Sequence, residues 1–318
     1  MAANNLRIIY QNLVDISTTT ITSSGSNAST PIANLKNDSK SIVWRSDPVS
    51  TGGGANNTYN IKTNLIVSLA TSTIIGGIVL PFCNLSTNAT IRVRGYTGTA
   101  PTPGTAPGGN YSGSSSVWTG FTTTGTQTFD TGTNSASPYV TLGKWDWGAL
   151  PLGVNSYSYG GGTYGRCWLL NKTQIAAQYL LIEIVDPTND SNYIELSRLV
   201  VGSYWSPTYN TSFGLSTSVK DLSVHNRSES GDLITNRGIS YNSMNFDLKY
   251  LNTSDRLQFS RISRGNGISK PLFISLFPDD EDIQKEQAHQ IYGKLSQLSD
   301  IQHPIFEMYS SQVEIEEI

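Results

Sequence analysis

The pattern with the most direct chemical meaning in this chain is the glycine-rich segment Gly160–Gly165, which matches G-x-G-x-x-G. That pattern holds the pyrophosphate of a dinucleotide when an apolar strand precedes it and a helix follows it. Here the polar residues 156–159 precede it and the strand-like residues 167–170 follow it. We therefore interpret the segment as a glycine-rich loop and assign no nucleotide or other cofactor to it.

Segment 186–195 carries oxygen ligands of the kind that calcium prefers, from Asp186, Asn189, Asp190 and Glu195. Aspartate, asparagine and proline are also the residues that tight hairpin turns use. Both interpretations stay open, with the hairpin turn as the main one. We accordingly assign no metal ligand and expect folding to need no metal ion.

Four consecutive carboxylates occupy positions 279–282. Acid–base catalysis needs two carboxylates held in different environments around a cleft, whereas a run of them at a helix start stabilises the helix dipole. Hydrolytic triads and zinc sites are poorly supplied, because the chain has three histidines, no G-x-S-x-G motif, and no histidine beside Cys83 or Cys167. A glycan-degrading enzyme would need a pair of carboxylates near the aromatic residues of 111–168, and only Asp130 and Asp146 offer one. We assign no catalytic residue and predict that the protein is not an enzyme.

A set of aromatic residues gathers in and after the glycine-rich part of the chain, and such rings can stack on sugars. The candidate glycan or partner contacts are Trp118, Tyr157, Tyr159 and Tyr164. Tyrosine and tryptophan are also enriched at protein–protein interfaces. The neighbouring tryptophans, which fit a packing role, are Trp145, Trp147 and Trp168. We favour packing and partner contact, and keep glycan binding as the alternative.

The composition is that of a folded β-protein with few charges. Charged residues make up 14% of the 318 residues, against about 25% in an ordinary globular domain. Six tryptophans and sixteen tyrosines argue against disorder, so we expect much of the surface to be covered by neighbouring proteins. A net charge of −3 without a Lys/Arg cluster leaves no electrostatic footprint for nucleic acid.

Segment 65–83 has no charge and is long enough to span a bilayer. Serine, threonine, glycine and proline interrupt it, and its apolar positions are β-branched, so we predict two buried strands with a turn near 71–73 and no membrane insertion. The N-terminus lacks a basic region followed by an apolar core, so we expect no secretory signal. Cys83 and Cys167 are interpreted as small buried side chains in a reducing cytoplasm, with a single disulfide left open.

Hydrophobic periodicity predicts most of the strands. In the first part of the chain they are 6–14, 42–46, 58–69, 73–82, 89–96, 166–170, 178–186 and 193–201; in the second part they are 245–250, 271–277 and one or two strands within 303–318. We predict one helix at about 280–298. Ile42 and Trp44 should share one strand face, with Trp44 buried against Ile91 and Val93 as structural core.

Three segments, Ala33–Ser46, Val79–Tyr96 and Tyr193–Pro207, resemble the tail-tip and baseplate proteins of long-tailed bacteriophages, of the kind called distal tail proteins. The resemblance implies a mainly β protein. Its first domain would be a discoidin-like jelly-roll β-sandwich over residues 1–207, with an outward-reaching Gly/Ser/Thr-rich insertion at about 98–165. A smaller β-rich assembly domain carrying the helix would follow at 223–318.

The same resemblance implies a structural function in the virion. The protein would form a homo-oligomeric ring around the tail axis, with six copies expected, and would connect the tail tube to tip, hub, fibre or receptor-binding proteins. It would be made and assembled in the host cytoplasm. The alternative is a carbohydrate-binding module of the tail that recognises a host-surface glycan.

Overall fold

The computed structural model describes residues 5–48, 59–102, 124–136, 163–169, 173–189, 191–212, 214–236, 238–278, 280, 282–305 and 307–318. They divide into two compact units. The sandwich unit comprises the described parts of 9–140 and 162–205, and the C-terminal unit comprises those of 1–8 and 206–318. Among the described residues, no helix is long and apolar enough to cross a membrane.

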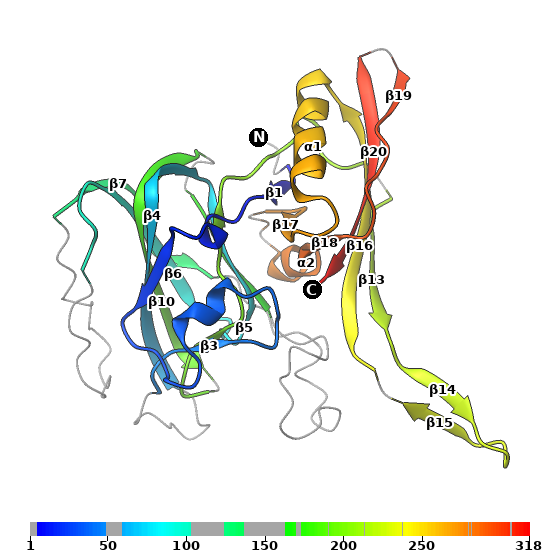
Figure 1. Cartoon of the computed structure of the whole chain (residues 1–318), viewed down its shortest axis with the longest axis horizontal. Helices are drawn as coiled ribbons and strands as arrows, with labels where there is room; N and C mark the ends of the chain where they lie inside the picture. The colour runs from blue at the N-terminus through cyan, green and yellow to red at the C-terminus, as the bar shows by residue number, and fades with distance from the viewer. Residues whose placement is uncertain are drawn as a thin grey trace. The chain divides into compact units, whose positions relative to one another are not determined.

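The sandwich unit consists of two antiparallel sheets and two short 3-10 helices (Figure 1). The first sheet has the order β2-β4-β10-β6-β7, with β8 also on β6: β2 Thr20–Ser23, β4 Tyr59–Ile75, β10 Ile175–Asn189, β6 Thr90–Thr97, β7 Thr126–Asp130 and β8 Asn134–Ser135. The second has the order β12-β5-β11-β3, with β9 also on β5: β12 Val200–Gly202, β5 Gly77–Cys83, β11 Glu195–Leu196, β3 Trp44–Arg45 and β9 Thr163–Trp168. The 3-10 helices are η1 Leu13–Asp15 and η2 Ile32–Lys36. The predicted mainly β, jelly-roll sandwich fold is confirmed.

Alternate residues of the long strands form one core between the sheets. Trp44, Ile91 and Val93 each have 0% of their surface exposed and belong to the same cluster. The indole Nε1 of Trp44 donates to Ser26 Oγ at 2.7 Å, so its polar atom is satisfied inside the core. Cys83 and Cys167 also lie in this core, both buried and with free thiols.

The predicted turn near 71–73 is wrong. Strand β4 continues to Ile75: its pairing with β10 shifts register between Ser68 and Thr73 and then resumes, as in Ile75 opposite Ile175. The chain breaks instead at Gly76, where a Cβ would lie 2.5 Å from the ring of Tyr204, and Gly77 is equally crowded by Trp168. Close ring packing therefore fixes the break between the two strands.

The N-terminal part of the first domain also differs from the prediction. Residues 6–14 do not form one strand: β1, Arg7–Ile9, pairs with β17 in the sheet of the C-terminal unit, and η1 follows it. Asn12 caps η1 by accepting a hydrogen bond from Val14 N at 3.2 Å. Ile42 lies before β3 and is 39% exposed, so it does not share the buried face of Trp44.

The insertion predicted at 98–165 is partly built into the sandwich. Strand β7 extends the first sheet from β6, and β8 pairs with the start of β6. Phe129 and Ala136 lie in the core cluster. A deletion of 98–135 would therefore remove sheet and core together, not a dispensable outward loop.

The C-terminal unit contains a seven-stranded sheet of order β1-β17-β18-β20-β16-β13, with β19 also on β20. Its strands after β1 are β17 Leu272–Ser275, β18 Gln290–Leu295, β20 Met308–Glu317, β16 Ser240–Leu251, β13 Ser216–Asp221 and β19 Gln302–Ile305. A separate two-stranded hairpin, β14 Val224–Arg227 and β15 Leu233–Asn236, continues from β13 and returns to β16 (Figure 1). The helices are α1 Thr253–Asn266 and α2 Ile283–Ala288.

The predicted helix at 280–298 is too long. Helix α2 ends at Ala288, and the next residues form β18 between β17 and β20. Gly293 allows this pairing, because a Cβ there would lie 1.9 Å from the Glu316 carbonyl oxygen. The acidic run does supply a cap, since Asp282 Oδ1 accepts from Lys285 N at 3.3 Å.

Helix α1 was missed in the sequence. Its signals are terminal ones: Asn252 Oδ1 accepts from Asp255 N at 2.8 Å, and Gly267 closes the helix at a φ of 56°. Phe259 and Ile262 are its buried apolar residues, and Leu257 is exposed, so its apolar stripe is too sparse for a periodicity argument.

Candidate functional site

The aromatic residues proposed as glycan contacts do not form a site in the described structure. Trp118, Tyr157 and Tyr159 lie outside the described residues. Tyr164 is 6% exposed, and its ring centroid lies 5.5 Å from that of Phe82. Its assignment as a glycan contact is corrected, because its ring is used in internal packing. Trp168 is likewise buried, edge-on to Tyr204.

The segment considered for calcium is an internally bonded turn. Asp186 is fully buried, and its carboxylate accepts hydrogen bonds from the backbone N–H and hydroxyl of Ser86, from Thr188 N and from Asn189 Nδ2. Glu195 pairs with Arg45. Asp190 lies outside the described residues. Protein donors thus already occupy the Asp186 oxygens that a cation would need.

Chelation is expected to leave the melting temperature unchanged, because the bonds around Asp186 need no cation. The measurement is thermal unfolding followed by circular dichroism, with and without excess EDTA. An Asp186→Asn variant is the matched control and should melt lower in both conditions, since it loses charge-assisted bonds in a buried site. A fall in chelator that added calcium restores would contradict this expectation.

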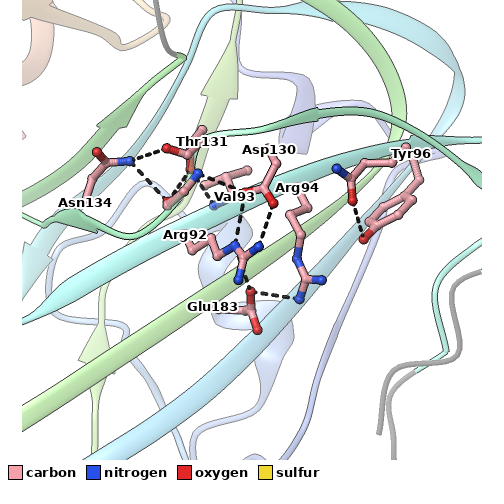
Figure 2. Close-up of polar contacts among 10 residues, drawn as sticks. Arg92, Val93, Arg94, Tyr96, Asp130, Thr131, Asn134 and Glu183 are labelled. Atoms are coloured by element: carbon pink, nitrogen blue, oxygen red, sulfur yellow. Dashed lines mark hydrogen bonds and ion pairs between the residues drawn. The ribbon is translucent and has the colours of Figure 1, made fainter. Parts of the chain in front are cut away.

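A cluster of four charged side chains lies on the outer face of the first sheet (Figure 2). Arg92 and Arg94 alternate along β6 and so share one face with Glu183, which stands opposite Arg92 on β10. Asp130 comes from the end of β7. The guanidinium of Arg92 donates twice to Asp130, from Nε at 3.0 Å and from Nη2 at 2.6 Å. Arg94 Nη2 lies 2.8 Å from Glu183 Oε2.

The ion pair between Arg92 and Asp130 joins β7, at the edge of the sheet, to β6. It does not supply an acid–base pair. The hydrogen bond from Arg92 lowers the pKa of Asp130, and burial opposes that effect only partly. A carboxylate with a lowered pKa stays ionised at neutral pH and cannot serve as a general acid there. Next to Asp130, the hydroxyl of Thr131 accepts from Val93 N at 2.9 Å, which ties the following turn to β6 (Figure 2).

The Asp130 pair should contribute a pH-dependent part of stability. Because the folded state lowers the pKa of Asp130, its contribution is present above the ordinary aspartate pKa of about 3.9 and is lost as the pH falls through the folded value. We expect Asp130→Asn to cost ~1 kcal/mol or less at pH 7, because the pair is partly exposed and screened. Urea unfolding at pH 7 and pH 3 should show a smaller difference from wild type at pH 3. Asp300→Asn, which changes a carboxylate without a partner among the described residues, is the control.

A surface of a different kind lies on the C-terminal unit, which we call the arm: residues 222–239, including β14 and β15. Every residue of β14 and β15 is exposed. Large apolar side chains are nevertheless concentrated there, each 43–58% exposed: Leu222, Val224, Leu233, Ile234 and Ile239. The arm is thus a folded element without a core of its own in the described structure.

Local bonds keep the arm in register. Four residue pairs align β14 with β15, from Val224 opposite Asn236 to Arg227 opposite Leu233. The tip is closed by Ser228 N donating to Asp232 O at 2.9 Å, with Gly231 at a φ of 89°. In this register Val224 and Ile234 share one face of the ribbon, and Leu233 lies on the other. The sequence analysis predicted no strand between 201 and 245, although the apolar residues on both sides of the turn S-E-S-G-D were an available signal.

Comparison with known proteins gives a likeness in structure only. No family model and no curated protein matches the chain. A family 32 carbohydrate-binding module of C. perfringens NanJ in complex with galactose matches at 10% identity and a TM-score of 0.34, over 61% of this chain and 98% of that one. A chitosan-binding module from Paenibacillus sp. IK-5 matches at 14% identity and 0.34, over 61% and 99%.

A third match is the GH29 fucosidase of Ruminococcus gnavus in complex with fucose, at 11% identity and a TM-score of 0.33. It involves 62% of this chain and only 27% of the fucosidase. The matches described are thus carbohydrate-binding modules and one glycosidase. Their identities and TM-scores are too low to transfer a ligand or a site.

Proposed function

We propose that this protein is a self-assembling structural component whose C-terminal unit joins neighbouring copies through the arm. The observation that carries the proposal is the exposure of five large apolar side chains on the arm, three of which (Val224, Leu233 and Ile234) lie on its two-stranded ribbon. An isolated two-stranded hairpin is at best marginally stable in water. A second surface that buries these side chains would therefore stabilise the arm as well as hold two copies together.

The size of the apolar surface supports the same proposal. Fully burying one large aliphatic side chain is favourable by about 1.5–3 kcal/mol, and association consumes part of that gain in lost freedom. Val224 and Ile234 lie on one face, so a single partner surface can cover both. The sparse charge of the chain, 14%, is consistent with a surface that neighbours cover.

Strand β13 offers a second contact of the same kind. It ends the sheet, and within the described residues it pairs only with β16. An open strand edge can pair with a strand of another chain. A head-to-tail contact of this kind, repeated between identical copies, closes into a ring when the rotation between them allows it.

The place of this ring follows from the sequence resemblance and is part of the proposal. The ring would surround the tail axis of a bacteriophage tail tip or baseplate, with six copies, and would join the tail tube to hub, fibre or receptor-binding proteins. The protein would belong to the virion and be assembled in the host cytoplasm. In this function the chain contributes interfaces and performs no catalysis.

The test is the mass and shape of the purified full chain. Light scattering coupled to size-exclusion chromatography should give a multiple of the 34.5 kDa chain, and electron micrographs should show closed rings. A monomer at all concentrations would overturn the proposal. For glycan recognition, the alternative, the candidate Tyr164 is buried in the described structure, so a glycan would need a surface other than this ring.

A further inference from the structure

The C-terminal unit contains a groove of about 610 Å³ on the side of β16 and β20. Its volume falls within the range of about 300–1,000 Å³ that is usual for small-molecule sites. It is lined by Asp247, Lys249, Tyr250, Gln297, Leu298, Ser299, Asp300, Gln302, Pro304, Ser310, Ser311 and Gln312. These residues come from β16, β20, β19 and the connection between β18 and β19.

An aromatic pair stands at this groove. Tyr250 lines it and is 51% exposed. It lies at the register shift between Leu248 and Leu251, where the pairing of β16 with β20 is interrupted. Tyr209, itself 50% exposed, packs edge-on against Tyr250 with ring centroids 6.4 Å apart. Two large rings are thus held by each other and left open to solvent.

The polar groups of the groove have unused hydrogen-bonding capacity. In the described part of the chain, the side chains of Gln297, Asp300 and Gln302 make no hydrogen bond, although all three line the groove. Lys249 Nζ lies 3.7 Å from Asp247 Oδ2, and both side chains are also partly exposed to solvent. Carboxylate, amide and ammonium groups therefore surround the space with both donors and acceptors.

This composition discriminates between ligand classes. The charged lining residues are Asp247, Asp300 and Lys249, two negative and one positive, so a phosphate or other anion is disfavoured. The apolar lining, Tyr250, Leu298 and Pro304, is too small for a lipid chain among so many polar groups. A neutral saccharide fits both parts, because its C–H face packs on an aromatic ring while its hydroxyls donate to carboxylates and accept from amides.

We propose that this groove binds a neutral saccharide, with Tyr250 as the stacking platform and Asp247 and Asp300 as hydroxyl acceptors. The site belongs to the C-terminal unit and is independent of the aromatic residues of the insertion and of the arm. It would add glycan binding to a protein whose main function is assembly.

The full chain should be titrated calorimetrically with neutral tetrasaccharides of glucose, galactose, mannose and N-acetylglucosamine. At least one should bind saturably, and Tyr250→Ser should weaken it by ~10-fold or more, as truncating an aromatic contact at the centre of a site does. Tyr250→Phe should retain binding, because the ring face is kept. Asp300→Asn should weaken binding without changing the melting temperature.

Leu257→Ser is the matched control, since Leu257 is a 49% exposed residue of the same unit that does not line the groove. It should leave the affinity unchanged. The proposal is overturned if none of the four tetrasaccharides binds, or if binding survives Tyr250→Ser, which would locate the glycan elsewhere. Tighter binding of a lysine-rich peptide than of any sugar would also overturn it, since the groove would then select positive charge.

Discussion

Replacing Trp44 with alanine is expected to lower the free energy of unfolding of the sandwich unit by about 3–5 kcal/mol. Trp44 is fully buried among residues of both sheets and makes up much of the volume at that point of the core. Its removal leaves a cavity that β3, a strand of two residues, is too short to close by itself. Because a whole domain is stable by only about 5–15 kcal/mol, this change should bring the unit close to unfolding. Urea unfolding followed by far-UV circular dichroism measures the effect.

Two further variants separate the loss of packing from the loss of the Trp44 hydrogen bond. Trp44→Phe keeps most of the packing but removes the hydrogen bond to Ser26, so it should cost clearly less than alanine. Ile42→Ala changes an exposed neighbour and should lie within about 0.5 kcal/mol of wild type. If Trp44→Ala cost no more than Ile42→Ala, the core described for the sandwich would be incorrect.

The second large effect is expected from the arm. The double variant Val224→Ser, Ile234→Ser removes both large apolar side chains from one face of the ribbon while leaving the backbone pairing intact. The assembled particle should dissociate to monomers at concentrations where wild type stays assembled, because the variant loses apolar burial at the contact. Light scattering across a dilution series measures the shift.

The matched control is Leu257→Ser on α1, which is equally exposed but lies outside the arm. It should assemble as wild type does. Thermal unfolding should show that the double variant keeps its fold, since both side chains are exposed in the single chain. Unchanged assembly of the double variant would show that the arm is not the contact.

Sequence patterns predicted the sandwich because its strands carry dense, alternating β-branched residues. In β6, Ile91 and Val93 alternate with Arg92 and Arg94, and a period of two is enough to assign both faces. The pattern could not predict which strands pair when they are far apart in the chain. The extension of β4 to Ile75 depends on its partner β10, in which Ile175 lies opposite Ile75 and far from it in the chain.

The C-terminal unit was harder to predict, for physical reasons that differ by element. Helix α1 is defined by its caps and buries few apolar residues, so its periodicity is weak. Strand β18 looked helical because Ile291 and Leu295 are four residues apart, yet tertiary pairing on both sides overrides that spacing. The groove escaped prediction because polar groups that line a surface have no distinctive spacing in the sequence.

The two buried thiols, Cys83 and Cys167, allow local opening of the sandwich to be measured by chemical labelling. Burial raises the pKa of the Cys83 thiol, and the thiolate is the form that reacts with alkylating reagents. Neither Cys83 nor Cys167 should therefore be labelled until the sheets separate locally, so the labelling rate counts opening events. Compared between free chains and assembled particles, that rate would show whether assembly changes how often the sandwich opens.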